Sequence, residues 1–413
     1  MTNPNPDQQA FIPEPLISFT NNQWYCHQAR QTVFFAAFSN ETPDLERLVT
    51  LAGDLLHFAP QLASGYLGAD PTRPISQQAL QELVSIETTS DLSAYPDQWQ
   101  TSGEQLFDTP DKPMFRIRAV VLSDSSSNAK PKSAIFVLST HSLFEGADSA
   151  LLSRSQSAGR DMVVLPPARQ SLIRRVYLAL VSSVLAPLQL LIAAIIAPRS
   201  TDHGYKTMTL SRESVRRVAA HLGVRQRSLL FALVAFGLND QGRTFSRRKI
   251  FVIYTDLEGT HVASTNDDFF RFRVIEAKFK VREDFAAFVK GVDREIQRKE
   301  KRDNTLNQAM LNALFAVHRR LKSWMPFLYP DRIFRFAGFY HLDLSMVTPH
   351  RLQGPLTKGM VEPVYCGTHH PGLQSSIFVP GKKYVTLNFT MDKRLLQKVG
   401  DVEKLFNDLE NSL

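Results

Sequence analysis

One short segment of the chain combines residue types that carry out acid–base chemistry: His141, Glu145, Gly146 and Asp148. It directly follows the apolar run 134–139, AIFVLS, which is typical of a central strand buried on both faces. An imidazole at the end of such a strand can reach a substrate beside the sheet, and it suits general-base catalysis because it titrates near neutrality. Glu145 can fold back across the turn, Gly146 permits a positive φ, and Asp148 falls in or just before the first turn of the next helix. Taken alone, this spacing favours a simpler alternative, a packed histidine in an ordinary strand–helix loop.

The chain around this segment alternates strands and helices. Apolar runs predict strands at 31–39, 115–122, 134–139, 205–210, 249–255 and 384–389. Helices are predicted after the N-cap residues Thr42 and Ser211, and over 228–238, 284–300, 310–324 and 391–413. The composition changes most near 160–205. We therefore expect an N-terminal part at 1–165, an apolar crossover at 166–204 and a C-terminal part at 205–413.

The composition excludes several classes of protein. A chain of 413 residues that is 43% hydrophobic is neither disordered nor collagen-like. Its two cysteines, Cys26 and Cys366, are too few for a disulfide scaffold or a cysteine zinc site, and no metal site is predicted. The net charge of +8 favours anionic partners in general, but no nucleic-acid module accompanies it. Because no signal sequence is visible near the N-terminus, we expect a cytoplasmic location.

The segment from Thr140 to Gly146 resembles the His-His-x-x-x-Asp-Gly motif of the CoA-dependent acyltransferase superfamily. That group includes wax ester synthase/diacylglycerol acyltransferases and the condensation domains of peptide synthetases. Further stretches are similar to the family at low identity and in the same order, namely 113–122, 134–139, 210–238 and 356–399. The resemblance implies an α/β fold of two similar mixed lobes, with the active site in a tunnel between them.

Two positions of the motif depart from the family pattern. Thr140 stands where the first histidine would be, whereas His141 matches the second, which is the catalytic base in the family. Glu145 replaces the motif aspartate, which usually has a structural role and is held by a basic residue. Arg116 and Arg118 are the nearest basic residues on the neighbouring predicted strand, and we expect one of them to pair with Glu145.

The resemblance implies acyl transfer from a thioester, with acyl-CoA as cosubstrate, to a hydroxyl or amine of a lipid-like acceptor. This is the chemistry of an O-acyltransferase similar to wax ester synthases. His141 would take the proton from the acceptor, and neither a metal nor a bound cofactor is required. The alternative is a catalytically silent homologue that binds lipids or partners through the same tunnel. The substitutions at Thr140 and Glu145 favour that alternative.

The crossover contains an apolar stretch, Val176–Ala197, of 22 residues without a charge. This length is just enough to span a bilayer. A single span would, however, place the two halves of a shared active site on opposite sides of the membrane. A pair of buried core helices is a second interpretation. We favour a third, monotopic insertion into the cytosolic membrane face by a helix that bends at Pro187, with headgroup contacts from the flanking arginines Arg174, Arg175 and Arg199.

Two other groups of residues are weaker candidates. His369-His370 is the only adjacent histidine pair, but Pro371-Gly372 follows, so the pattern favours a turn. His341-x-Asp343 is more simply explained by alternation along a strand.

Overall fold

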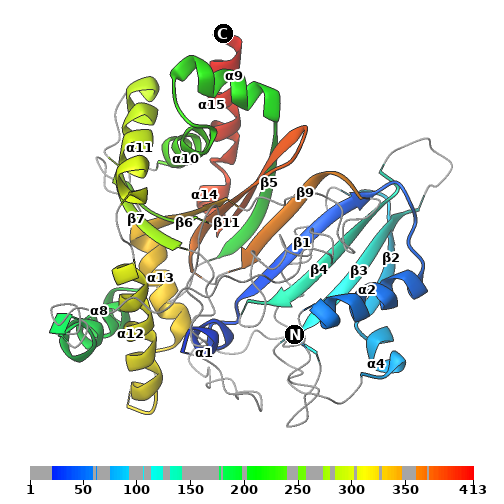
Figure 1. Cartoon of the computed structure of the whole chain (residues 1–413), viewed down its shortest axis with the longest axis horizontal. Helices are drawn as coiled ribbons and strands as arrows, with labels where there is room; N and C mark the ends of the chain where they lie inside the picture. Colours follow the sequence, from blue (N-terminus) through cyan, green and yellow to red (C-terminus); the bar gives the residue numbers. More distant parts are fainter. Residues whose placement is uncertain are drawn as a thin grey trace.

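The structure is a computed structural model of the whole chain. It describes residues 21–58, 62, 75–92, 106, 113–123, 131–141, 176–177, 180–197, 202–239, 250–256, 273–279, 284–301, 305–324, 328–346, 360–369 and 372–413. Two mixed β-sheets with helices packed against them form two lobes (Figure 1). The predicted α/β architecture of two mixed lobes is therefore confirmed.

The first sheet, called sheet A, has five strands in the order β2-β3-β4-β1-β9. These are β1 (Thr32–Ser39), β2 (Val84–Thr89), β3 (Phe115–Leu122), β4 (Ser133–Thr140) and β9 (Met360–His369). Every residue of β4 is buried, as the continuous apolar run predicts for a strand in the middle of a sheet. The helix α2 (Leu45–Phe58) packs against β2 and β3, and the short helices α1 (Asn21–Gln28) and α4 (Gln77–Gln81) complete the described part of this lobe.

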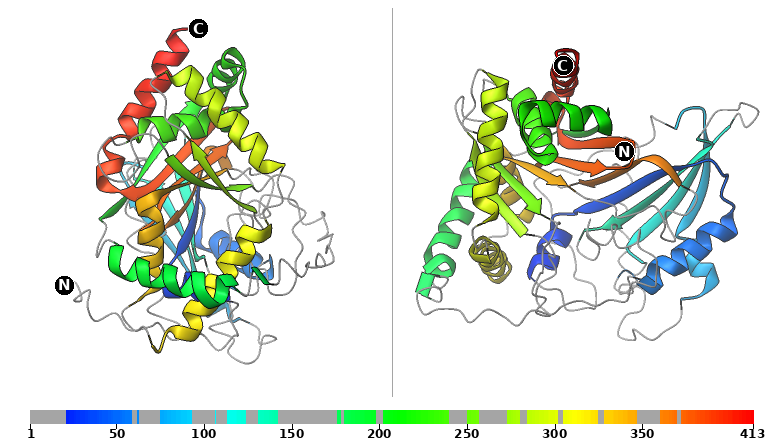
Figure 2. Two further views of the ribbon diagram at one scale, coloured as in Figure 1. Left: turned by 90° about the vertical axis from the view of Figure 1, so that its left-hand side faces the viewer. Right: turned by 45° about the horizontal axis from the view of Figure 1, so that its top comes forward.

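The second sheet, called sheet B, has six strands in the order β5-β11-β10-β8-β6-β7. These are β5 (His203–Ser211), β6 (Ile250–Asp256), β7 (Arg273–Phe279), β8 (His341–Met346), β10 (Gln374–Pro380) and β11 (Tyr384–Asp392). The helices described around it are α9 (Arg212–Leu222), α10 (Gln226–Gly237), α11 (Phe285–Glu300), α12 (Thr305–Leu321), α13 (Pro330–Tyr340), α14 (Lys393–Leu396) and α15 (Val399–Asn411). Figure 2 shows several of these helices stacked on one side of the sheet.

Helix boundaries in this lobe follow from local capping chemistry. The Ser211 hydroxyl accepts a hydrogen bond from the Ser214 amide and begins α9, and Gly223, at a φ of 67°, ends it. The Asp284 carboxylate accepts from the amides of Ala286 and Ala287 and begins α11. The predicted starts of both helices are confirmed. In each helix, a side-chain acceptor satisfies backbone amides that would otherwise lack partners.

The two lobes are joined by β9, which comes from the C-terminal part of the sequence but pairs with β1 at the edge of sheet A. Gly367 allows Phe34 to lie directly over β9, since a Cβ there would be 2.1 Å from Phe34 Cε1. Phe34 in turn packs edge-on against Tyr205 of β5, with ring centroids 5.0 Å apart. The C-terminal part of the sequence therefore contributes one strand to the sheet of the N-terminal lobe.

The described part of the apolar crossover is a five-residue π-helical turn, η4 (Val181–Leu185), followed directly by α8 (Ala186–Ile196). Pro187 lies in the first turn of α8, where its missing N–H costs no helical hydrogen bond. The predicted interruption at this proline is thus a junction between two helical forms. In the part of the chain that the structure describes, no helix has the length and apolarity to cross a bilayer.

Candidate active site

His141 follows the last residue of β4, and its backbone N–H donates to the Gln31 carbonyl at 2.8 Å. Gln31 is held in turn at the end of α1, where its amide donates to the Cys26 carbonyl and Arg30 adopts a left-handed φ of 50°. The His141 side chain is 6% exposed. The backbone of His141 is therefore fixed from two sides. It follows the end of β4, and it is bonded to the turn that leads from α1 into β1.

Beside His141, a row of three residues crosses sheet A: Thr140 pairs with Thr32, and Thr32 pairs with His369. Directly paired residues of antiparallel strands point to the same face of a sheet. Phe34 lies two residues along on this face and contacts β5, so the face that carries the row is turned toward sheet B. Tyr365, also on this face, hydrogen-bonds Thr209 of β5.

Sheet B turns an equally polar face toward sheet A. Leu342 and Leu344 of β8 belong to the hydrophobic core under the helices, so Asp343 between them points the other way. Pairing places Asp343 beside Ser375 of β10, and Ser375 beside Thr390 of β11. Two residues along β10, Ile377 belongs to the hydrophobic cluster of sheet A. The polar residues of the two sheets thus face the region between the lobes.

Burial changes the acidity of two residues on these facing surfaces. It raises the pKa of the Asp343 carboxyl to about 7, although the Ser375 and Ser345 hydroxyls donate to it at 3.3 and 3.5 Å and oppose the shift. Burial, together with the neighbouring His203, lowers the pKa of His369 to about 4. Near neutral pH, the region between the lobes therefore presents a neutral imidazole and a carboxyl that readily holds a proton.

Several predicted site residues lie outside the described residues, namely Glu145, Gly146, Asp148, Arg174, Arg175 and Arg199. Arg118 forms an ion pair with Glu87 of β2 at 3.2 Å, and Arg116 donates to the carbonyls of Pro113 and Phe115. The predicted pairing of Arg116 or Arg118 with Glu145 stays a prediction. Within the described ranges, no group of three or more His, Cys, Asp or Glu side chains gathers as metal ligands would.

Sequence reasoning assigned little weight to two residues that lie on the facing surfaces, His369 and Asp343. The turn predicted around His369 is wrong for His369 itself, because pairing with Thr32 extends β9 to this residue and the turn comes at Gly372, with a φ of 94°. Asp343 does follow strand alternation, as predicted. The sequence did contain a clue. Asp343 lies between Leu342 and Leu344, and alternation along a strand puts an acid at this position on the face away from the two leucines.

Comparison with known proteins rests on structure. Searches with protein-family models and among curated proteins found no match. Among solved structures, the fold is similar to the wax ester synthase/diacylglycerol acyltransferase from Marinobacter aquaeolei VT8, at a TM-score of 0.50 and 13% identity over 92% of this chain and 94% of that one. It is similar to TRI3 trichothecene 15-O-acetyltransferase from Fusarium sporotrichioides, at a TM-score of 0.53 and 12% identity over 94% and 95%. A third similar structure is the first condensation domain of the CDA synthetase, at a TM-score of 0.50 and 12% identity over 98% and 97%.

Proposed function

We propose, on the premise that the chain has the fold of the CoA-dependent acyltransferases, that it transfers an acyl group from a thioester to a lipid-like alcohol or amine. The observation that carries this proposal is the position of His141. It leaves the end of an inner strand, next to the polar row that faces the other lobe. A general base must lie within hydrogen-bond reach of the acceptor, so this position would place the reacting acceptor between the lobes.

In the proposed reaction, a His141 ring nitrogen takes the proton of the acceptor hydroxyl or amine while the acceptor atom attacks the thioester carbonyl. The new C–O or C–N bond forms, the C–S bond breaks, and the departing thiolate takes the proton back from the imidazolium. Acyl-CoA is the proposed donor because the thioester itself activates the acyl group. The chain then needs no bound cofactor for this chemistry.

Turnover of radiolabelled acyl-CoA with long-chain alcohols or amines tests this function. We expect wild-type turnover and a loss of about 10²–10⁴-fold in His141→Ala, the usual effect of removing a general base. Unfolding curves that match between the two proteins would show that the loss is chemical. No wild-type turnover, combined with lipid binding, would instead establish the silent homologue.

We also propose that the protein docks on an anionic membrane surface through the outer face of α8, called the α8 face. Ala186, Leu190 and Ala193 of α8 are buried against neighbouring helices. The remaining side of the crossover exposes large apolar side chains, namely Val176, Leu180, Val184, Leu185, Leu188, Leu191, Ile195 and Ile196. Figure 1 shows α8 on the outer side of α12 and α13, with which it is in contact. A surface helix that is apolar on all sides is typical of an interaction surface.

Charge and aromatic residues near the α8 face favour lipid as its occupant. The helix α12 contacts both η4 and α8, and its last turn is basic, with Arg319 and Arg320. Trp324 follows three residues after the end of this helix and is 82% exposed. Basic side chains beside an apolar face bind anionic headgroups, and tryptophan favours the membrane interface. A lipid acceptor would then reach the site from the cytosolic membrane face.

Cosedimentation with vesicles tests this docking. We expect the protein to sediment with phosphatidylcholine vesicles that contain phosphatidylserine, and the triple variant Leu188→Glu, Leu191→Glu, Ile195→Glu to lose at least tenfold in binding. The matched control is Leu45→Glu, an exposed leucine of α2, which should bind as wild type. If the triple variant binds vesicles equally well, or if it only converts a dimer into a monomer, the α8 face is not a membrane surface.

A further inference from the structure

The proposed reaction requires a donor for the negative charge that develops on the thioester carbonyl oxygen, and Asp343 has the position and chemistry for this role. It lies on β8, an inner strand of sheet B, on the face turned toward sheet A. The residue as a whole is half-buried, whereas burial of the carboxyl itself dominates its acidity. Sheet A carries His141 next to the opposing polar row.

The immediate partners of Asp343 are hydroxyls. Ser375 Oγ donates to Oδ2 at 3.3 Å, whereas Ser345 Oγ is 3.5 Å from Oδ1, too far for a strong bond. No described lysine, arginine or histidine forms an ion pair with this carboxyl. Burial therefore dominates and raises its pKa to about 7.

These contacts distinguish the two oxygens. Oδ2 accepts the hydroxyl of Ser375, so it acts as the carbonyl oxygen of the neutral acid. Oδ1 has the weaker contact, so in the acid form it is the oxygen better placed to carry the proton and to present an O–H to a ligand. A buried carboxylic acid that stays neutral is an effective hydrogen-bond donor to an oxyanion, because the proton is already in place before charge develops.

We propose that Asp343, in its acid form and oriented by Ser375, donates a hydrogen bond to the carbonyl oxygen of the acyl group. This inference rests on the proposed acyl transfer. It assigns the two halves of the reaction to the two lobes. His141 of the first lobe takes the acceptor proton, while Asp343 of the second stabilises the oxyanion, so that neither lobe suffices alone.

Other titratable or charged residues lie on the facing surfaces or on the helix α13 that contacts β8. These are His203, Tyr205 and Asp392 on sheet B, Tyr365 and His369 on sheet A, and Asp331, Arg332 and Arg335 on α13. On α13, Arg335 pairs with Asp331, and Arg332 donates to the Ala194 carbonyl. On sheet B, Tyr205 donates to Asn388 at 2.8 Å. Of the two sheet B carboxyls with a shifted pKa, Asp392 is held below its ordinary value whereas Asp343 is raised to about 7, so ionisation of Asp343 falls within the pH range of the test.

The test compares kcat for acyl transfer across pH 5.5–9 in wild type, Asp343→Asn and Asp343→Leu. Asparagine keeps an N–H donor and an oxygen for Ser375 but cannot ionise, whereas leucine has neither. We expect a bell-shaped profile for wild type, with an alkaline fall as Asp343 ionises. Asp343→Asn should stay within about tenfold of the wild-type maximum and lose the alkaline fall. Asp343→Leu should lose about 10²–10³-fold in kcat, as removal of an oxyanion donor does.

Ser375→Ala provides a second variant that keeps the acid but loses its orientation, and we expect an intermediate loss in kcat with little change in KM. Asp401→Asn, an exposed acid of α15, is the matched control and should behave as wild type. If wild type transfers acyl groups but Asp343→Asn keeps the alkaline fall or loses as much as Asp343→Leu, Asp343 is not the donor and the proposed function stands. If wild type transfers nothing, both proposals fail.

Discussion

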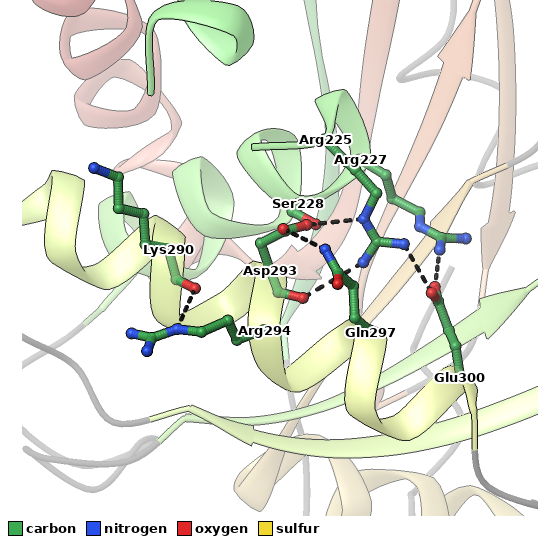
Figure 3. Close-up of polar contacts among 8 residues, drawn as sticks. All are labelled: Arg225, Arg227, Ser228, Lys290, Asp293, Arg294, Gln297 and Glu300. Atoms are coloured by element: carbon green, nitrogen blue, oxygen red, sulfur yellow. Dashed lines mark hydrogen bonds and ion pairs between the residues drawn. The ribbon is translucent and has the colours of Figure 1, made fainter. Parts of the chain in front are cut away.

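Two acids of the second lobe, the buried Asp293 and the half-buried Asp343, differ in how their carboxyls are held. Asp293 of α11 is 7% exposed and lies within a network between α10 and α11 (Figure 3). Its Oδ1 accepts from Ser228 Oγ at 2.5 Å and Arg225 Nε at 2.8 Å, and Oδ2 accepts from Gln297 Nε2 at 2.7 Å. Burial alone would raise the pKa of this carboxyl, but the bonds from Ser228 and Arg225 outweigh it and hold the pKa below its ordinary value.

Asp343 has two serine hydroxyls at longer distances and no cationic partner among the described residues, so its pKa moves the other way. Burial raises the pKa of both carboxyls, and the number and charge of the donors decide how far that rise is opposed. A carboxylate with a guanidinium partner and three bonds stabilises the packing of two helices, whereas one without a counter-ion costs free energy when it ionises. One acid of this lobe thus has a structural role, and a different acid has the proposed chemical role.

The largest expected effect on stability is at Asp293. Asp293→Ala removes the acceptor of three side chains and leaves Ser228 buried without its partner, which should lower the free energy of unfolding by about 3 kcal/mol. Urea denaturation followed by circular dichroism measures this change. Arg294→Ala on the same helix is the control, because Arg294 is exposed and, among the described residues, bonds the Lys290 carbonyl rather than the network (Figure 3). If both variants unfold alike, the network has no structural role.

A smaller effect is expected where the lobes join. A Cβ at Gly367 would overlap the Phe34 ring, so Gly367→Ala should cost about 1–3 kcal/mol through overpacking and also disturb the junction between β9 and β1. We expect activity per folded molecule to fall here, unlike in Asp293→Ala.

Gly400 supplies the contrast to Gly367. It lies in the first turn of α15, and a Cβ added there would meet no atom within 4 Å. Gly400→Ala should therefore leave stability unchanged or raise it by up to about 1 kcal/mol. Thermal unfolding of both variants, with transfer rates, checks the pair. Equal effects of the two substitutions would mean that the contact between Phe34 and β9 is not tight.

A further expected effect is in the pH dependence of stability. Because the pKa of Asp343 rises from its ordinary value to about 7 on folding, the folded state binds more protons between about pH 4 and 7. The free energy of unfolding contributed by this group therefore falls as pH rises through that window. Asp343→Asn should remove the fall, so that the variant gains on wild type at pH 8 but not at pH 4. Parallel curves for the two proteins would contradict the raised pKa.

Much of the local structure could be predicted because its causes are local. The continuous apolar run 134–139 predicted β4, and the N-cap residue Ser211 predicted where α9 begins. His141 was found from the sequence because the segment around it resembles a family motif, whereas its spacing alone favoured a packed histidine. Its role as base, and the roles of Glu145 and Gly146, stay predictions.

What the sequence determined by itself was therefore the elements, their ends and the position of one histidine after an inner strand. Only the tertiary structure decided that β9 crosses to β1, which puts His369 in line with Thr140 although they are more than 200 residues apart in sequence. It also decided which face of β8 meets the other lobe. Pairing across such separations depends on many non-local contacts at once, and the pKa of Asp343 depends on the burial that those contacts create. Neither can be obtained from the residues that surround a position in the sequence.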